Sequence, residues 1–155
     1  MNIILNAAEA AFVALLTPAA SGRGVVLPGK SSLNKTLPCV ICSADGGSVE
    51  EDPKNTGNYW INMDVIIQSS AVPNEDGTAM TPVDPTPFDE QLVSDIHSAI
   101  QASDFSDTIS AATTNFTVFP EGVIYESAQS GRDEHGVWND SQRLRLYCCA
   151  SAIAV

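Results

Sequence analysis

Hydrophobic residues near the start of the chain recur at intervals of three and four. They are Ile4, Ala8, Ala11, Phe12 and Leu15, and the residues between them are rich in alanine. This spacing places an apolar stripe along one side of a helix, and alanine is the strongest helix former. The pattern predicts an amphipathic helix over residues 3–16, which Thr17-Pro18 ends.

Two central segments have the pattern of strands. Residues 37–44, LPCVICSA, are short, β-branched and followed by Gly46-Gly47, which predicts a strand that enters a turn. In YWINMDVIIQSS, residues 59–70, apolar side chains occupy every second position from Tyr59 to Ile67. This alternation predicts a strand with one buried face and one largely polar face.

A second helix is expected after the second strand. Thr86 suits its cap, Pro87 its first position and Asp89 the reciprocal capping position. Its apolar stripe consists of Phe88, Leu92, Ile96, Ala99 and Ile100. The helix is expected to end near Ser103.

The last third of the chain predicts a long hairpin. Its strands span roughly residues 114–128 and 137–153, and the polar stretch SGRDEHG separates them. In the last strand two alternating sets of side chains should face opposite ways, as on a strand covered on one side. The first set is Leu144, Leu146, Cys148 and Ala150, and the second is Arg143, Arg145, Tyr147 and Cys149.

These segments predict a single α+β domain over residues 1–155. It has a mostly antiparallel sheet with two packed helices, in the order α-β-β-α-β-β. Two long loops, residues 17–36 and 69–86, connect the elements, and loops of this length are often functional.

The composition limits the classes of function. The 155 residues carry 19 acidic and 7 basic side chains, a net charge of −12, which repels phosphate backbones and argues against tight nucleic-acid binding. No apolar run reaches the roughly 18 residues of a membrane span, so a soluble protein without a membrane partner is expected. The stretch 1–16 has no Lys or Arg before its apolar residues and contains Glu9, which favours a helix of the mature protein over a signal peptide.

Few residues have the spacing of a chemical site. Cys39 and Cys42 have the spacing of a zinc or redox pair, but they lie on a predicted strand, where side chains three apart point to opposite faces. His97 and His135 lack metal-ligand spacing, and the acidic run 50–52 lacks the pattern of a calcium loop. Neither a nucleophile motif nor a phosphate-binding motif occurs. The sequence therefore predicts a protein that is not an enzyme, with no catalytic, metal-binding or cofactor-binding residues, and cysteines that serve as small core residues.

The basic side chains form two groups in the sequence. They are Arg23, Lys30 and Lys35 in the first long loop, and Arg132, Arg143 and Arg145 near the end of the chain. On an acidic subunit, local positive patches that face acidic patches of a neighbour can set the register of an assembly. We regard these six residues as candidate intersubunit or neck contacts, although ordinary surface residues would have the same pattern.

The central segments resemble those of a known family. LPCVICSADGG, an acidic turn and NTGNYWINMDVIIQSSA, with the helix before them and the helix and hairpin after them, resemble the tail terminator, or tail completion, proteins of tailed bacteriophages. The resemblance lies in hydrophobic pattern and segment order, and it covers nearly the whole chain. It implies a structural virion protein that forms a hexameric ring at the head-proximal end of the tail tube.

The resemblance also implies partners and a location. The ring would end tube polymerisation, contact the tail tube protein and the neck or head-closure protein, and pass DNA through its bore without specific binding. It would be found in the virion after assembly in the bacterial cytoplasm. Loops 17–36 and 69–86 would make intersubunit or neck contacts.

Two other classes of function remain open. Another neck or head-closure protein, or the tail tube subunit itself, could share this order of elements. A small non-enzymatic module that binds a peptide at an exposed sheet edge would need an uncovered strand. The mass in solution discriminates between a closed ring, an open polymer and a monomer.

Overall fold

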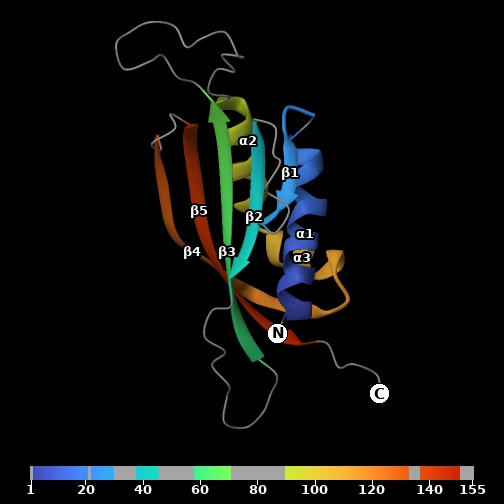
Figure 1. The fold of residues 1–155 in the computed structure, drawn as a ribbon. Helices are drawn as coiled ribbons and strands as arrows, with labels where there is room; N and C mark the ends of the chain where they lie inside the picture. Colours follow the sequence, from blue (N-terminus) through green and yellow to red (C-terminus); the bar gives the residue numbers. More distant parts are fainter. Residues whose placement is uncertain are drawn as a thin grey trace, which may run out of the picture.

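A computed structural model describes residues 2–20, 22–29, 38–45, 58–70, 90–132 and 137–150 of the chain. These residues form an α+β fold of three helices and five strands (Figure 1). In chain order the elements are α1 (Asn2–Ala20), β1 (Val25–Pro28), β2 (Cys39–Asp45), β3 (Asn58–Ser70), α2 (Glu90–Ile100), α3 (Phe105–Ala112), β4 (Phe116–Arg132) and β5 (Val137–Ala150). The α+β class that the sequence predicts is confirmed.

The five strands form one mixed sheet in the order β1-β2-β3-β5-β4. The pairs β2–β3, β3–β5 and β4–β5 are antiparallel, and only β1 runs parallel to its neighbour β2. The predicted sheet was mostly antiparallel, which this pairing confirms, but β1 was not predicted. The final hairpin of β4 and β5 is confirmed and is longer than expected on its first strand.

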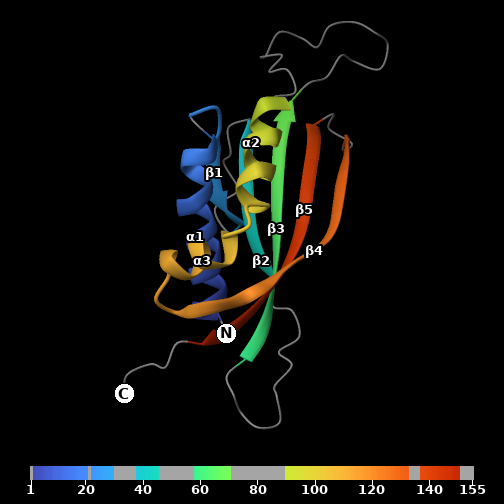
Figure 2. The same ribbon diagram turned by 180° about the vertical axis from the view of Figure 1, so that it is seen from behind.

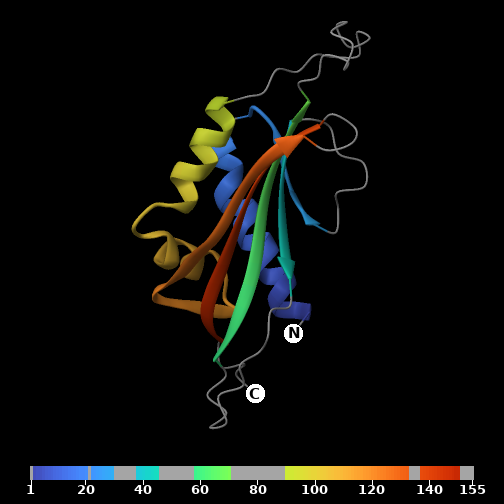
Figure 3. The same ribbon diagram turned by 90° about the vertical axis from the view of Figure 1, so that its left-hand side faces the viewer.

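All three helices lie on the same face of the sheet (Figures 2 and 3). Apolar side chains fill the space between the two layers, and the largest of them that are fully buried are Phe12, Phe116, Leu16, Ile61, Met63, Ile67, Leu92, Ile96, Ile100, Ile109, Leu144 and Leu146. The opposite face carries no helix among the described residues. The sheet therefore has a helix-covered face and a helix-free face.

The side-chain alternation follows the prediction in the two central strands. On β3, residues 61, 63, 65 and 67 are buried, whereas their described neighbours are half-buried. On β5, Leu144, Leu146 and Cys148 are fully buried, and the residues between them are half-buried. The predicted division of β5 into a core side and an outer side is confirmed over these residues.

The first helix is longer than its pattern predicts. α1 continues through Pro18 to Ala20, so the expectation that Thr17-Pro18 ends it was wrong. Proline lacks the backbone N–H that would bond to the Ala14 carbonyl, so the last turn of α1 has one hydrogen bond fewer. The Thr17 hydroxyl donates a hydrogen bond to the Val13 carbonyl at 2.6 Å, within the same last turn of α1 as Pro18.

The predicted loop 17–36 contains a strand. β1 has only four residues, VVLP, between glycines, so periodicity gave no signal for it. Glu9 of α1 fixes its end: this carboxylate, 4% exposed, accepts a hydrogen bond from the backbone N–H of Gly29 at 2.8 Å. A Cβ at Gly29 would lie within 3 Å of the Ser43 side chain, so β1 packs closely against both α1 and β2.

A third helix follows α2, so the predicted count of two helices and the order α-β-β-α-β-β were wrong. α2 ends at Ile100 instead of near Ser103, and α3 begins at Phe105. Because α3 is rich in Ser, Thr and Asp, its propensity is low. Its two buried residues, Phe105 and Ile109, are four apart and place it on the core.

The first part of β4 departs from regular pairing. Its register on β5 shifts between Val118 and Val123, and Glu121 within this bulge has a φ of 59°. Pro120 is tolerated there because β4 is an edge strand of the sheet. Residues before the bulge bend toward the helix side, where the Ser110 hydroxyl of α3 accepts a hydrogen bond from the Val118 N–H at 3.0 Å (Figure 2).

Some predicted features lie outside the described residues. They are the start of the second helix at Thr86, Pro87, Phe88 and Asp89, most of the loop 69–86, and residues 133–136 of the hairpin turn. Residues 151–153 of the last predicted strand also lie outside.

Candidate functional site

The helix-free face of the sheet carries a cluster of charged side chains from four strands. Arg143 on β5 lies at its centre: its guanidinium is 3.3 Å from Asp64 on β3, 3.5 Å from Glu126 on β4 and 3.6 Å from Asp45 on β2. Arg145 lies 3.3 Å from the other oxygen of Glu126. We call these five residues the arginine cluster.

Strand register explains why these side chains meet. Asp64 on β3 is directly opposite Arg143 on β5, and Ser127 on β4 is opposite the same arginine. A second register shift, between Tyr125 and Ser127, accompanies the contact of Glu126 with Arg143 and Arg145. The cluster therefore depends on a bulge as well as on alternation.

The arginine cluster contains three carboxylates and two guanidinium groups. Burial raises the pKa of the Asp64 carboxyl above its ordinary value of 3.8, the Arg143 guanidinium lowers it, and the Asp45 and Glu126 carboxylates raise it again. The net result is a raised pKa, so the folded state binds a proton at Asp64 more readily than the unfolded chain. With three carboxylates for two guanidinium groups, the positive charges of the cluster are more than compensated.

Arg143→Met is expected to lower the free energy of unfolding by about 1 kcal/mol, because partly exposed ion pairs each contribute a fraction of that amount. The three carboxylates would then repel one another without the central cation. The loss should be largest at low salt, since salt screens this repulsion. Urea unfolding at two salt concentrations measures it.

Adding Asp64→Asn to Arg143→Met is the matched comparison. It removes one of the three repelling carboxylates and should restore part of the lost stability. A loss that is independent of salt and unchanged by the second substitution would contradict this description of the cluster.

Aromatic side chains continue the same face toward the other end of the strands. The rings of Trp60 and Tyr147 have centroids 4.7 Å apart, and Phe119 stacks on the other side of Tyr147 at 4.8 Å. The Arg145 guanidinium lies over the Trp60 ring, 4.5 Å from its centroid. Arg145 thus joins the arginine cluster to the aromatic row, and the contacts rigidify the face across β3, β5 and β4.

His97, to which the sequence assigns no chemical site, makes a contact with the sheet. On α2 it lies beside the buried stripe, and its Nε2 is 2.8 Å from the Asp140 carboxylate on β5. Both side chains are partly covered, and they belong to the helix-covered face. The pair connects α2 to the sheet, and the Tyr125 hydroxyl, which donates to the Ile100 carbonyl, connects β4 to the end of the same helix.

The cysteines lie in the interior. Cys39, Cys42 and Cys148 are fully buried, Cys149 is half-buried, and none of the four forms a disulfide. Burial raises the pKa of Cys42 to about 12, and the Glu9 carboxylate adds to the shift. Burial also raises the pKa of Cys148 to about 12, with a smaller effect from Cys149.

The buried thiols predict a pH dependence. A neutral thiol with a raised folded-state pKa contributes stability below its ordinary pKa of 9.0, and this stability is lost as the pH rises toward 12. The free energy of unfolding should therefore begin to fall above about pH 9, and Cys42 and Cys148 should react with a thiol reagent at pH 8 only when the protein unfolds. A flat stability between pH 8 and 11, or labelling of both thiols at the unfolded rate, would contradict this.

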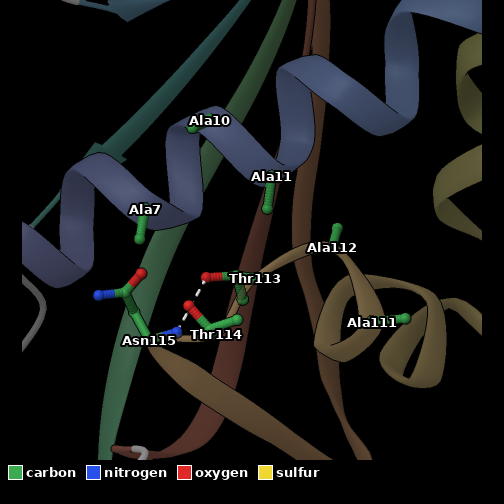
Figure 4. A pocket seen from close by; sticks show the side chains of 8 residues that line it. All are labelled: Ala7, Ala10, Ala11, Ala111, Ala112, Thr113, Thr114 and Asn115. Atoms are coloured by element: carbon green, nitrogen blue, oxygen red, sulfur yellow. Dashed lines mark hydrogen bonds between the residues drawn. The ribbon is translucent and has the colours of Figure 1, made fainter. Parts of the chain in front are cut away.

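A pocket of about 330 Å³ opens on the helix side, between α1 and the turn that connects α3 to β4. Figure 4 shows its lining, which is mostly small: alanines of α1 and α3 on two sides and Thr113, Thr114 and Asn115 on the third. The Thr113 hydroxyl accepts a hydrogen bond from the Asn115 N–H at 3.2 Å. None of the lining residues carries a charge, so the pocket has no group for acid–base chemistry.

The structure places the six basic candidates in different ways. Arg143 and Arg145 belong to the arginine cluster, Arg23 lies in the turn between α1 and β1, and Arg132 ends β4. Lys30 and Lys35 lie outside the described residues. The structure therefore brings two of the six together and pairs both with carboxylates of the same chain.

The partners of these arginines were not predicted from the sequence. Asp45, Asp64, Glu126 and Trp60 come from three other strands. Strand parity could have placed Asp64 on the outer face with Arg143, but the strand order and the bulges of β4 have no local signal.

No family model matches the chain, and no curated protein matches it either. In the described part of the chain, none of the helices is both long and apolar enough to cross a membrane. Three or more His, Cys, Asp or Glu side chains that could hold one metal ion do not occur together among the described residues.

Proposed function

We propose that this protein is a structural virion subunit that forms a ring at the head-proximal end of a phage tail tube. The ring, with six copies as the expected number, ends tube polymerisation and joins the tail to the neck. Its partners are further copies of itself, the tail tube protein and the neck protein. It assembles in the bacterial cytoplasm and remains in the virion.

The helix-free face carries this proposal. A surface that DNA passes must not hold phosphates, and isolated arginines on it would do so. On this face both arginines of the cluster are engaged by Asp45, Asp64 and Glu126 of the same chain. Together with the net charge of −12, this compensation suits a bore that lets DNA slide through without binding.

The layered fold supports a structural role as well. Helices cover one face of the sheet and the described helices leave the other uncovered, so a ring can present one face inward and the other outward (Figure 3). Heterologous association of such subunits closes a ring when the rotation between neighbours fits a whole number of copies.

Electron microscopy of the purified protein tests the proposal. The images should show closed rings with a central hole. In a second measurement, the same protein should pass through a DNA-affinity column at low salt without being retained. Open-ended stacks would instead favour a tail tube subunit, and particles of a single chain would favour a binding module that uses its sheet edge. Retention on DNA at low salt would contradict a passive bore.

A further inference from the structure

The exposed apolar side chains are concentrated on the two edges of the sheet. Among the described residues, the large hydrophobic side chains that remain exposed are Val25 at 49%, Ile124 at 43% and Tyr125 at 46%. Val25 belongs to β1, and the other two belong to β4. β1 and β4 are the opposite edges of the described sheet.

The edges carry only part of the protection against pairing with other strands: Pro28 ends β1, and a second bulge with Glu126 interrupts β4 between Tyr125 and Ser127. Natural edge strands are protected by charged residues, proline or bulges. In β4, Pro120 and the first bulge lie before residue 123, whereas the later stretch, residues 127–131, reads SAQSG and has no charge. Described side chains from 124 to 130 are all exposed, so both faces of this half of β4 reach solvent.

β1 matches this edge in chemistry. Its four residues, VVLP, carry no charge. In a chain of net charge −12, two copies repel each other least where both surfaces are neutral. A second copy of this chain is therefore the partner that fits the two edges.

The register of the two edges is consistent with one continuous sheet. Val25 is opposite Cys39, which lies with Gln68 on the helix-free face, and Ile124 is opposite Arg145 on the same face. If the β1 edge of one copy pairs with the β4 edge of the next, Val25 and Ile124 both lie on the shared helix-free face. Backbone hydrogen bonds would add to the apolar contact.

We propose that copies of this chain associate head to tail through the β1 edge of one copy and the β4 edge of the next. The two contact surfaces are different, as a ring or an open polymer requires. This inference rests on the self-association in the proposed function and specifies its contact. The arginine clusters of successive copies would then line one continuous face.

Cysteine cross-linking tests the contact directly. Three variants are made in a Cys149→Ser background: Val25→Cys, Ile124→Cys and the double variant, and each is treated with a short bifunctional maleimide. Each single variant should stay monomeric on a denaturing gel, and their mixture should give a two-copy band. Gln101→Cys, exposed between α2 and α3, is the matched control and should not cross-link with either.

The double variant separates this inference from the ring. A ladder that stops at a fixed number of copies supports both the edge contact and the ring, whereas a ladder without an end supports the edge contact and overturns the ring. A two-copy band from Ile124→Cys alone would indicate a symmetric β4–β4 dimer and overturn the inference. Failure of the mixture to cross-link would also overturn it, whether or not the protein is oligomeric.

A charge substitution provides the second measurement. Val25→Lys and, separately, Ala128→Lys should each weaken self-association at least about tenfold, because a lysine at an edge opposes strand pairing. Gln101→Lys adds the same charge away from the edges and should leave association unchanged. Equal effects of all three substitutions, with melting unchanged, would overturn the inference.

Discussion

Replacing Phe12 by alanine is expected to lower the free energy of unfolding by about 3–5 kcal/mol. Phe12 is 0% exposed at the centre of the core. Its ring meets that of Phe105 edge to face, with centroids 5.4 Å apart, so it holds α1 against α3. Because domains of this size are stable by only about 5–15 kcal/mol, the loss would be a large share of the total.

Urea unfolding followed by circular dichroism measures this loss. Leu15→Ala on the same helix is the control, since Leu15 is only half-buried and should cost clearly less. Similar losses for the two variants would contradict the position of Phe12 at the centre of the core.

Replacing Gly122 by alanine is expected to lower the free energy of unfolding by about 2–3 kcal/mol, in the range of overpacked sites. A Cβ at this position would lie 2.7 Å from the Phe119 carbonyl oxygen and 2.9 Å from the Tyr147 carbonyl oxygen. Both atoms belong to the backbone, so relief requires the β4 bulge to move away from β5. The aromatic row should loosen as a result, because Phe119 stacks on Tyr147.

Gly131→Ala is the matched control on the same strand. A Cβ there meets nothing within 4 Å, so the substitution should be neutral or slightly stabilising. Thermal melts of both variants, with near-ultraviolet circular dichroism for the aromatic row, give the comparison. Equal melting temperatures would show that the bulge has room for a side chain.

The sequence predicted those elements whose burial is periodic over many residues. α1, β3 and β5 each place several apolar side chains on one face, so alternation or helical spacing identified them. β1 and α3 are four and eight residues long, and such elements owe their structure to tertiary packing more than to local pattern. Glu9 and Gly29, which fix β1, are 20 residues apart and gave no joint signal.

The site was harder to predict than the fold. Arg143 and Arg145 could be placed on the outer side of β5 by alternation alone. Their carboxylate partners depend on strand order, since β5 lies between β3 and β4, and on a bulge that brings Glu126 to both arginines. Hydrophobic periodicity in a single sequence does not show which distant strands pair with each other.

The arginine cluster changes the interpretation of the basic residues. As candidate contacts, Arg143 and Arg145 were expected to meet acidic groups of a neighbour, but each lies beside carboxylates of its own chain. Under the proposed function, the two arginines keep the helix-free face rigid, and their positive charges are balanced by carboxylates of the same chain. Contacts between copies then fall to the neutral edges of the sheet.

The most direct test of the proposed function is the mass of the purified protein by light scattering, measured across concentration at low and high salt. We expect one closed species near six copies of the 16.4 kDa chain, with a mass that does not grow as concentration rises. Because the proposed contacts are neutral, high salt should not dissociate it. A mass that stays at one chain, or one that increases without limit with concentration, would contradict a closed ring.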